Sequence, residues 1–166
     1  MFKVNDLIQY GADGVCRISD ITEREFRGQK VTYYVLNPVF NDRSTLYVPA
    51  NNETLVSRMR YALSADEITS IIKDDSLVDL PWIENESERK LRYKEIIHGG
   101  DSVQLVRVVK TLYSHQQAQK AAGKKMHMCD ERLFHDAERV LYDEYAVALG
   151  ISPDEVLPHI KQLMES

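Results

Sequence analysis

Residues 31–36 read VTYYVL, an uncharged run of β-branched and aromatic side chains, and this stretch decides the fold of the first part of the chain. Such residues favour β-strands. Arg27-Gly28-Gln29 precedes the run as a turn sequence, and Asn37-Pro38 follows it. Outward from this strand, further strand patterns cover residues 7–10, 15–21 and 45–48. Four or five short strands at close spacing predict a small, strongly bent sheet or barrel.

The pattern changes from strands to helices after about residue 52. Ser64 and Glu67 form a capping-box signature before a short apolar run. Apolar residues at helical spacing then cover 85–98, 101–113 and 130–149, and a Ser-Pro pair at 152–153 opens a final helix, whereas residues 74–82 indicate a loop. The sequence therefore predicts an α+β fold with two domains, residues 1–52 and 53–166.

The composition is that of an ordinary globular protein. Of 166 residues, 43% are hydrophobic and 28% charged, which excludes a wholly disordered chain. No apolar run approaches the roughly 20 residues of a membrane helix, and the N-terminus lacks the apolar core of a signal peptide. We therefore expect a cytoplasmic protein without a membrane partner. Cys16 and Cys129 lie far apart, which favours two free thiols.

The sequence gives no positive reason to expect an enzyme. None of the histidines lies in a His-Glu-x-x-His pattern or beside a cysteine pair, and no Gly-rich phosphate loop is present. Met126-His127-Met128-Cys129 has the soft donors of a metal site, but it is also the expected loop before the next helix. We predict no catalytic residues, no metal and no cofactor.

The net charge of −5 hides an uneven distribution of charged residues. Residues 82–125 have a basic excess, while residues 61–81 and 126–166 are acidic. A local basic excess can bind phosphate, because screening limits the reach of each charge to about 10 Å at 0.1 M salt. The alternative is a solvated helix face neutralised by neighbouring glutamates. The basic residues singled out as a DNA-binding surface are Arg89, Lys90, Arg92, Lys94, Lys124 and Lys125.

Trp82 is the only tryptophan, and it follows Pro81 at the edge of this basic segment. A lone tryptophan is commonly a packing residue. The other interpretation is an apolar wedge that enters a base step of DNA, with Lys and Arg on the neighbouring phosphates. Both interpretations stay open, and we count Trp82 with the basic residues as a candidate DNA-binding residue.

Several short strings occur in a fixed order along the chain. They include FKVND at 2–6, YYVL at 33–36, VPANN at 48–52, RYK at 92–94, VVKTL at 108–112 and LYDE at 141–144. In order and spacing they resemble the CarD family of bacterial transcription regulators, over nearly the whole chain.

The resemblance implies a Tudor-like β-barrel followed by an all-α domain. The barrel is similar to the polymerase-interacting module of the transcription-repair coupling factor, and we expect it to bind the RNA polymerase β subunit through an exposed sheet edge. Arg24 aligns with a basic position on that face, and Tyr47 stands where the family often has a basic residue. The helical domain is expected to contact promoter DNA at the backbone and minor groove, with little sequence specificity, and to stabilise the open complex.

One departure concerns the tryptophan wedge that the family implies. About seven extra residues, two helical turns, separate Trp82 from the string Arg92-Tyr93-Lys94, and the insertion is acidic. Either the helix begins earlier and carries Trp82 outward, or Trp82 is not the wedge. The alternative function is a polymerase-binding adaptor that does not bind DNA. The sequence carries no signal for a particular oligomeric state.

Overall fold

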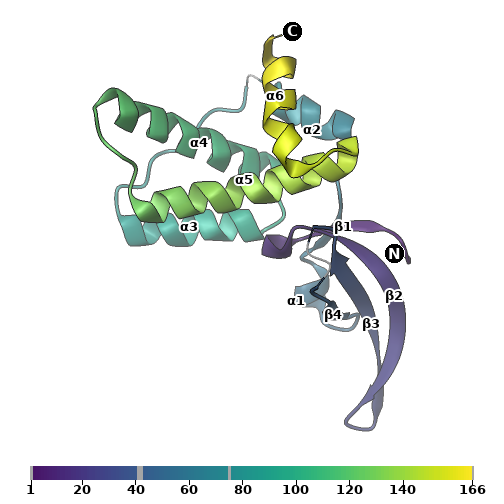
Figure 1. Cartoon of the computed structure of the whole chain (residues 1–166). Helices are drawn as coiled ribbons and strands as arrows, with labels where there is room; N and C mark the ends of the chain where they lie inside the picture. The colour runs from purple at the N-terminus through teal and green to yellow at the C-terminus, as the bar shows by residue number, and fades with distance from the viewer. Residues whose placement is uncertain (1, 41–42, 75, 166) are drawn as a thin grey trace.

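The computed structural model describes residues 2–40, 43–74 and 76–165. Residues 41 and 42, before the strand predicted at 45–48, and residue 75 of the predicted loop lie outside the described residues. An antiparallel sheet is followed by a group of helices (Figure 1). The elements are β1 Leu7–Tyr10, η1 Gly11–Asp13, β2 Val15–Phe26, β3 Gln29–Pro38, β4 Leu46–Pro49, α1 Glu53–Val56, β5 Met59–Tyr61, α2 Ala65–Ile72, α3 Glu86–His98, α4 Ser102–Ala121, α5 Met128–Leu149, η2 Pro153–Glu155 and α6 Val156–Glu165.

The sheet has the strand order β4-β3-β2-β1-β5 and is built around one long hairpin. Strands β2 and β3 pair as far as Phe26 and Gln29. The turn between them uses Arg27 and Gly28 at φ values of 54° and 77°, as a two-residue hairpin loop requires. β4 pairs with β3 only up to Tyr33, so the tip of the hairpin is a two-stranded ribbon that extends away from the body (Figure 1).

The predicted α+β class is confirmed, with one additional strand that the sequence pattern does not predict. β5 pairs with β1, from Ile8–Tyr61 to Tyr10–Met59. Its three residues carry no strand pattern of their own, so the pairing with β1 sets their conformation. The sheet therefore continues past the predicted boundary at residue 52. Within the described residues β4 and β5 do not pair with each other, so the barrel has the form of a bent sheet with two free edges.

In the helical part, α3, α4 and α5 lie side by side, and α2 and α6 lie near the C-terminal end of α5 (Figure 1). Their shared core consists of aliphatic and aromatic side chains from all three long helices, including Tyr93, Ile97, Leu105, Val108, Leu112, Leu133, Ala137 and Leu141. The predicted capping box at Ser64 and Glu67 is present. None of the helices in the described part of the chain is long and apolar enough to cross a membrane.

A buried ion pair joins the sheet module (residues 2–61) to the helical module (residues 62–165). Arg60 of β5 donates to both carboxylate oxygens of Glu144 on α5, at 2.7 and 2.9 Å. Glu144 is completely buried and also accepts the backbone N–H of Leu63 at 2.8 Å. Arg60 further donates to the Gly100 carbonyl, in the connection between α3 and α4, and to the Ser102 hydroxyl at the start of α4. These contacts hold the hairpin and the helices as two arms of an L (Figure 1).

Candidate functional site

The two residues predicted to bind the polymerase, Arg24 and Tyr47, touch each other on one face of the sheet. The Arg24 guanidinium lies 4.7 Å from the centre of the Tyr47 ring and donates to its hydroxyl at 3.5 Å. The ring of Tyr33 packs against Tyr47 edge-on, with centroids 6.5 Å apart. Arginine and tyrosine are enriched in protein interfaces and their energetic hot spots. We call these three residues the hairpin patch; the sequence pattern marks Tyr33 only as a strand residue.

The strand that carries Tyr47 is an end strand of the sheet. The N–H of Ala50 donates to the carbonyl of Thr32 at 2.8 Å, so alternate positions of β4 turn their backbone groups toward β3. By that alternation Tyr47 turns its backbone N–H and C=O to the open edge. An edge of this kind can pair with a strand of another protein, and Pro49, which lacks an N–H, limits its length.

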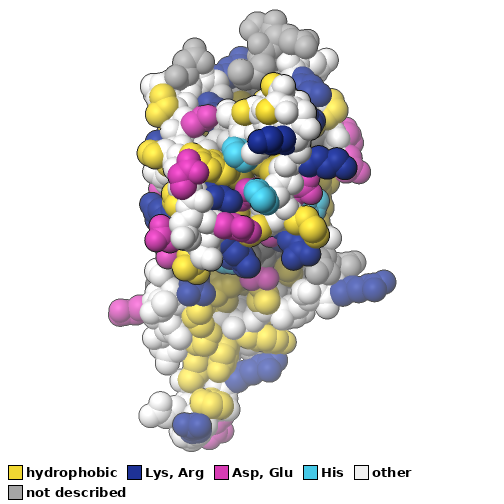
Figure 2. Space-filling view, turned by 90° about the vertical axis from the view of Figure 1, so that its left-hand side faces the viewer, with side chains coloured by type: hydrophobic (Ala, Val, Ile, Leu, Met, Phe, Trp, Pro, Cys, Tyr) yellow, Lys and Arg dark blue, Asp and Glu magenta, His cyan; other side chains and the backbone are white. Residues whose placement is uncertain are grey.

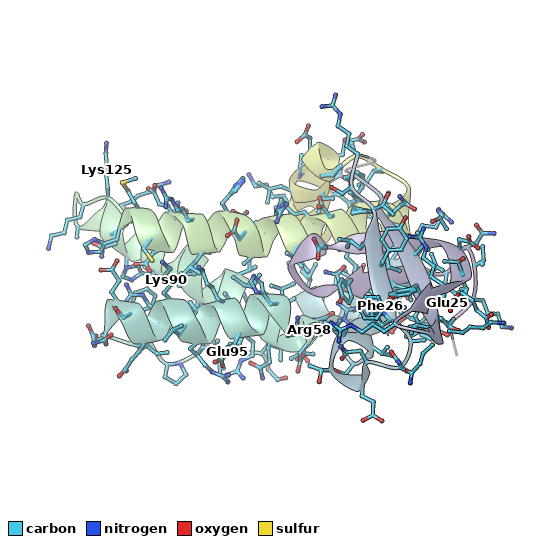
Figure 3. The ribbon with its side chains drawn as sticks, turned by 90° about the horizontal axis from the view of Figure 1, so that it is seen from below. Glu25, Phe26, Arg58, Lys90, Glu95 and Lys125 are labelled. Carbon is cyan, nitrogen blue, oxygen red and sulfur yellow. The ribbon has the colours of Figure 1, made fainter. Side chains whose placement is uncertain are left out.

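A furrow between α3 and α5 gathers three cations. Lys90 and Lys94, one helical turn apart on α3, and Arg132 on α5 line a cavity of about 240 Å³, in which Asp136 is the acidic group. Figure 3 shows Lys90 between the two helices. Arg132 was missed because it lies in the acidic segment 126–166. Only the packing of α5 against α3 brings it to the basic side chains of the earlier segment.

The other predicted basic residues are exposed in different settings. Lys124 and Lys125 lie in the connection between α4 and α5, and Figure 3 shows Lys125 at that end of the module. Arg92 forms an exposed ion pair with Glu95 at 3.5 Å on the same helix. Figure 2 faces this end of the molecule and shows Lys and Arg mixed with Asp, Glu and His. The basic surface is therefore a set of separated cations rather than a continuous patch.

The expectation that Arg89 contacts DNA is corrected by the structure. Arg89 is only 4% exposed, and it donates to both oxygens of the buried Asp130 carboxylate, at 2.9 and 3.0 Å. Its remaining terminal nitrogen donates to the carbonyl of Ile83 at 2.8 Å. Helical periodicity places Arg89 on the same buried side of α3 as Tyr93, and Asp130 supplies the counter-charge that makes burial tolerable.

Trp82 packs against the helical core. Helix α3 begins at Glu86, so Trp82 precedes the helix and is not carried outward by it. Its half-buried ring stacks on His115, with centroids 3.8 Å apart, and meets Tyr93 edge-on at 6.5 Å. The Arg89 guanidinium lies 4.5 Å from the ring centre. Burial lowers the pKa of His115, which favours the neutral ring in this stack. These contacts support the packing interpretation of Trp82.

The soft-donor segment 126–129 is divided between two environments. Met126 is 6% exposed and belongs to the helical core, while Met128 is 70% exposed. Within the described part of the chain, no three His, Cys, Asp or Glu side chains gather as metal ligands would. Cys16 and Cys129 are both free.

Two family models match the chain one after the other. The CarD-like/TRCF RID domain matches residues 2–60, and the CarD C-terminal domain matches residues 67–161. The chain belongs to the CarD family. No curated protein was found to match it. The two CarD matches meet between β5 and α2, where the sheet ends, and membership of the family makes the chain a transcription regulator that interacts with RNA polymerase.

Within this CarD-family chain the candidate residues separate by module. The hairpin patch and the β4 edge lie in the region matched by the RID domain, and the furrow cations lie in the region matched by the C-terminal domain. The ion pair of Arg60 and Glu144 joins the two regions. The hairpin patch and the furrow cations are thus held in one folded unit by this ion pair.

Proposed function

We propose that the chain binds the β subunit of RNA polymerase through the hairpin patch and the β4 edge, and contacts the promoter DNA backbone through Lys90, Lys94, Arg132 and the lysines after α4. The observation that supports this function most directly is the placement of the two surfaces on separate arms of one molecule, joined by a buried ion pair. A factor of this shape stabilises the open complex by binding polymerase and DNA together.

The DNA contact is electrostatic and weak by itself. Phosphate contacts position a protein on the duplex but carry no sequence information. The cations are separated by acidic groups, and the whole chain has a net charge of −5, so long-range attraction to DNA is small. Binding to polymerase compensates for this, because tethering raises the local concentration of the helical module at the DNA to roughly millimolar.

A second candidate function is the adaptor that binds polymerase without DNA. Arg89 is buried and Arg92 is paired with Glu95, which removes two of the predicted phosphate contacts. Salt-dependent binding of the full chain to forked promoter DNA separates the two functions. Binding that weakens with salt supports the DNA-contacting factor, and binding below detection at low salt supports the adaptor.

For the polymerase contact, we expect Arg24→Glu to weaken binding to a purified β-subunit fragment by at least about tenfold, or ~1.4 kcal/mol. An exposed ion pair contributes only about 0.2–1 kcal/mol, so most of the loss comes from the repulsion that the new carboxylate adds. The affinity is measured by calorimetry.

The matched control for this experiment is Lys30→Glu. Lys30 pairs with Glu25, whereas Arg24 pairs with Val31, so strand alternation places Lys30 on the opposite face of the same hairpin. The affinity of the Lys30→Glu variant for the β-subunit fragment is expected to stay near that of the unmodified chain. If Lys30→Glu weakens binding and Arg24→Glu does not, the interface lies on the other face of the hairpin.

For the DNA contact, Lys90→Ala and Lys94→Ala should each reduce the slope of log K against log salt by about 0.9, the value for one phosphate contact on a duplex. The loss is expected to be similar on unrelated DNA sequences, because phosphates are common to all of them. Fluorescence anisotropy with labelled duplexes measures both quantities. Unchanged slopes in both variants contradict the DNA-contacting function and favour the adaptor.

A further inference from the structure

A second cavity lies at the corner where the sheet module meets α3. Its volume is about 560 Å³, and both modules line it. Lys94 belongs to the lining of this corner cavity and also to that of the furrow between α3 and α5, so the two hollows are neighbours. The corner is lined by Tyr10, Gly11, Asp13, Arg58, Leu91, Lys94, Glu95, His98 and Gly99.

Arg58 is the cation that the sheet module contributes to this corner. It lies in the turn between α1 and β5, and its side chain is exposed. The ion pairs found among the described residues do not include it. Figure 3 shows Arg58 beside the C-terminal end of α3, while Lys90 and Lys125 lie toward the other end of the helical module. Arg58 therefore continues the line of Lys90 and Lys94 along α3.

The corner contains two carboxylates, Asp13 and Glu95, beside its cations. Its remaining contacts nevertheless favour an anionic ligand. The Glu95 carboxylate is paired with Arg92 at 3.5 Å, which leaves Asp13 as the acidic group without such a partner among the described residues. The Tyr10 hydroxyl is protonated at neutral pH, and burial raises its pKa further, so it can donate a hydrogen bond. Arg58, Lys94 and Tyr10 together offer a guanidinium, an ammonium and a hydroxyl donor, all of which bind phosphate oxygens.

We propose that Arg58 binds a backbone phosphate of the same DNA that lies along Lys90 and Lys94. This inference rests on the proposed function, because it extends the DNA contact of α3 across the junction onto the sheet module. The sheet module then does more than anchor the chain on polymerase, since it holds the DNA directly. A planar guanidinium with several donors suits this position, because it can reach two oxygens of one phosphate.

The test measures binding of the full chain to labelled duplex DNA without polymerase, over a range of salt. Arg58→Ala is expected to lower the slope of log K against log salt by about 0.9 and the affinity at 0.1 M salt by roughly five- to tenfold. Arg58→Lys keeps the charge and should retain the slope. Lys73→Ala is the matched control, because Lys73 ends α2, which lies away from α3 (Figure 1), and its slope should be unchanged.

The outcomes distinguish this inference from the function on which it rests. If Lys94→Ala lowers the slope and Arg58→Ala does not, the corner inference is overturned and the proposed function stands. If the unmodified chain shows no salt-dependent binding to DNA, both are overturned. If Arg58→Ala instead weakens binding to the β-subunit fragment and leaves the DNA slope unchanged, the corner is a protein contact and the inference fails.

Discussion

Glu144→Gln should lower the free energy of unfolding by about 3 kcal/mol, at the lower end of the range for breaking a buried ion pair. The change leaves the Arg60 guanidinium facing a neutral amide in a site where Glu144 has no exposed surface. Arg60 retains a side-chain exposure of 25%, so water compensates part of the loss. For a chain of this size the melting temperature should fall by roughly 6–12 °C. Thermal unfolding followed by circular dichroism measures the change.

Glu131→Gln is the matched control, because Glu131 is exposed on the same helix and the chemical change is identical. Its melting temperature should stay within about 2 °C of that of the unmodified chain. A melting temperature for Glu144→Gln equal to that of Glu131→Gln would mean that the ion pair does not hold the modules together.

The same variant also tests whether the fixed angle between the modules matters. The hairpin patch lies on β2, β3 and β4, whereas the Glu144 carboxylate accepts hydrogen bonds from Arg60 of β5 and from Leu63. The affinity for the β-subunit fragment should therefore not change while the chain is folded. If the proposed function holds, the half-life of the open complex should fall, because the helical module is no longer held in a fixed direction relative to the hairpin that we propose binds polymerase. An unchanged half-life in a variant with a lower melting temperature would show that the covalent connection between the modules is enough for the effect on the open complex, without a fixed angle between them.

The elements that the sequence predicts well are those whose signals are local. The hairpin of β2 and β3 follows from the run at 31–36 and the turn at Arg27 and Gly28, and the helix starts follow from side chains that cap the backbone within three residues. Strand β5 could not be predicted, because its pairing with β1 joins residues some fifty positions apart in the sequence and three residues carry no pattern of their own.

The candidate surfaces show the same limit of local reasoning. Arg89 and Lys90 are neighbours in a basic run, yet one is buried against Asp130 and the other is exposed in the furrow. The deciding residue, Asp130, belongs to another helix, and the charge pattern along α3 contains no information about it. Arg58 and Arg132 were overlooked for the converse reason, because their own segments are not basic and only the packing brings them to Lys94.

Trp82→Ala is expected to destabilise the helical module by about 2–3 kcal/mol. The value is somewhat below that of a fully buried aromatic residue, since the ring is half-buried. The variant loses the stack on His115 and the edge contact with Tyr93, and the segment before α3 loses one of the side chains that pack on the core. The melting temperature should fall by roughly 5–10 °C. The conservative variant Trp82→Phe should recover part of the loss, because it keeps an aromatic ring for the stack.

A titration of His115 provides a second readout that a wedge in DNA would not affect. Burial lowers the pKa of His115 in the folded chain, and the Trp82 ring lies directly against the imidazole. Removing the tryptophan admits water to the ring, so the pKa of His115 should rise toward its ordinary value in Trp82→Ala. The imidazole proton resonances in NMR spectra recorded over a pH series measure the change. The sign is fixed, because less burial favours the charged imidazolium.

The wedge interpretation of Trp82 makes the opposite set of predictions. A wedge pays a cost of a few kcal/mol to unstack a base step and recovers it by stabilising melted or bent DNA. Its removal would leave the melting temperature and the His115 titration unchanged and would shorten the half-life of the open complex. That result would overturn the packing role, because truncating a side chain that packs on the core must lower the stability of the folded chain. If all three measurements are unchanged, Trp82 has neither role.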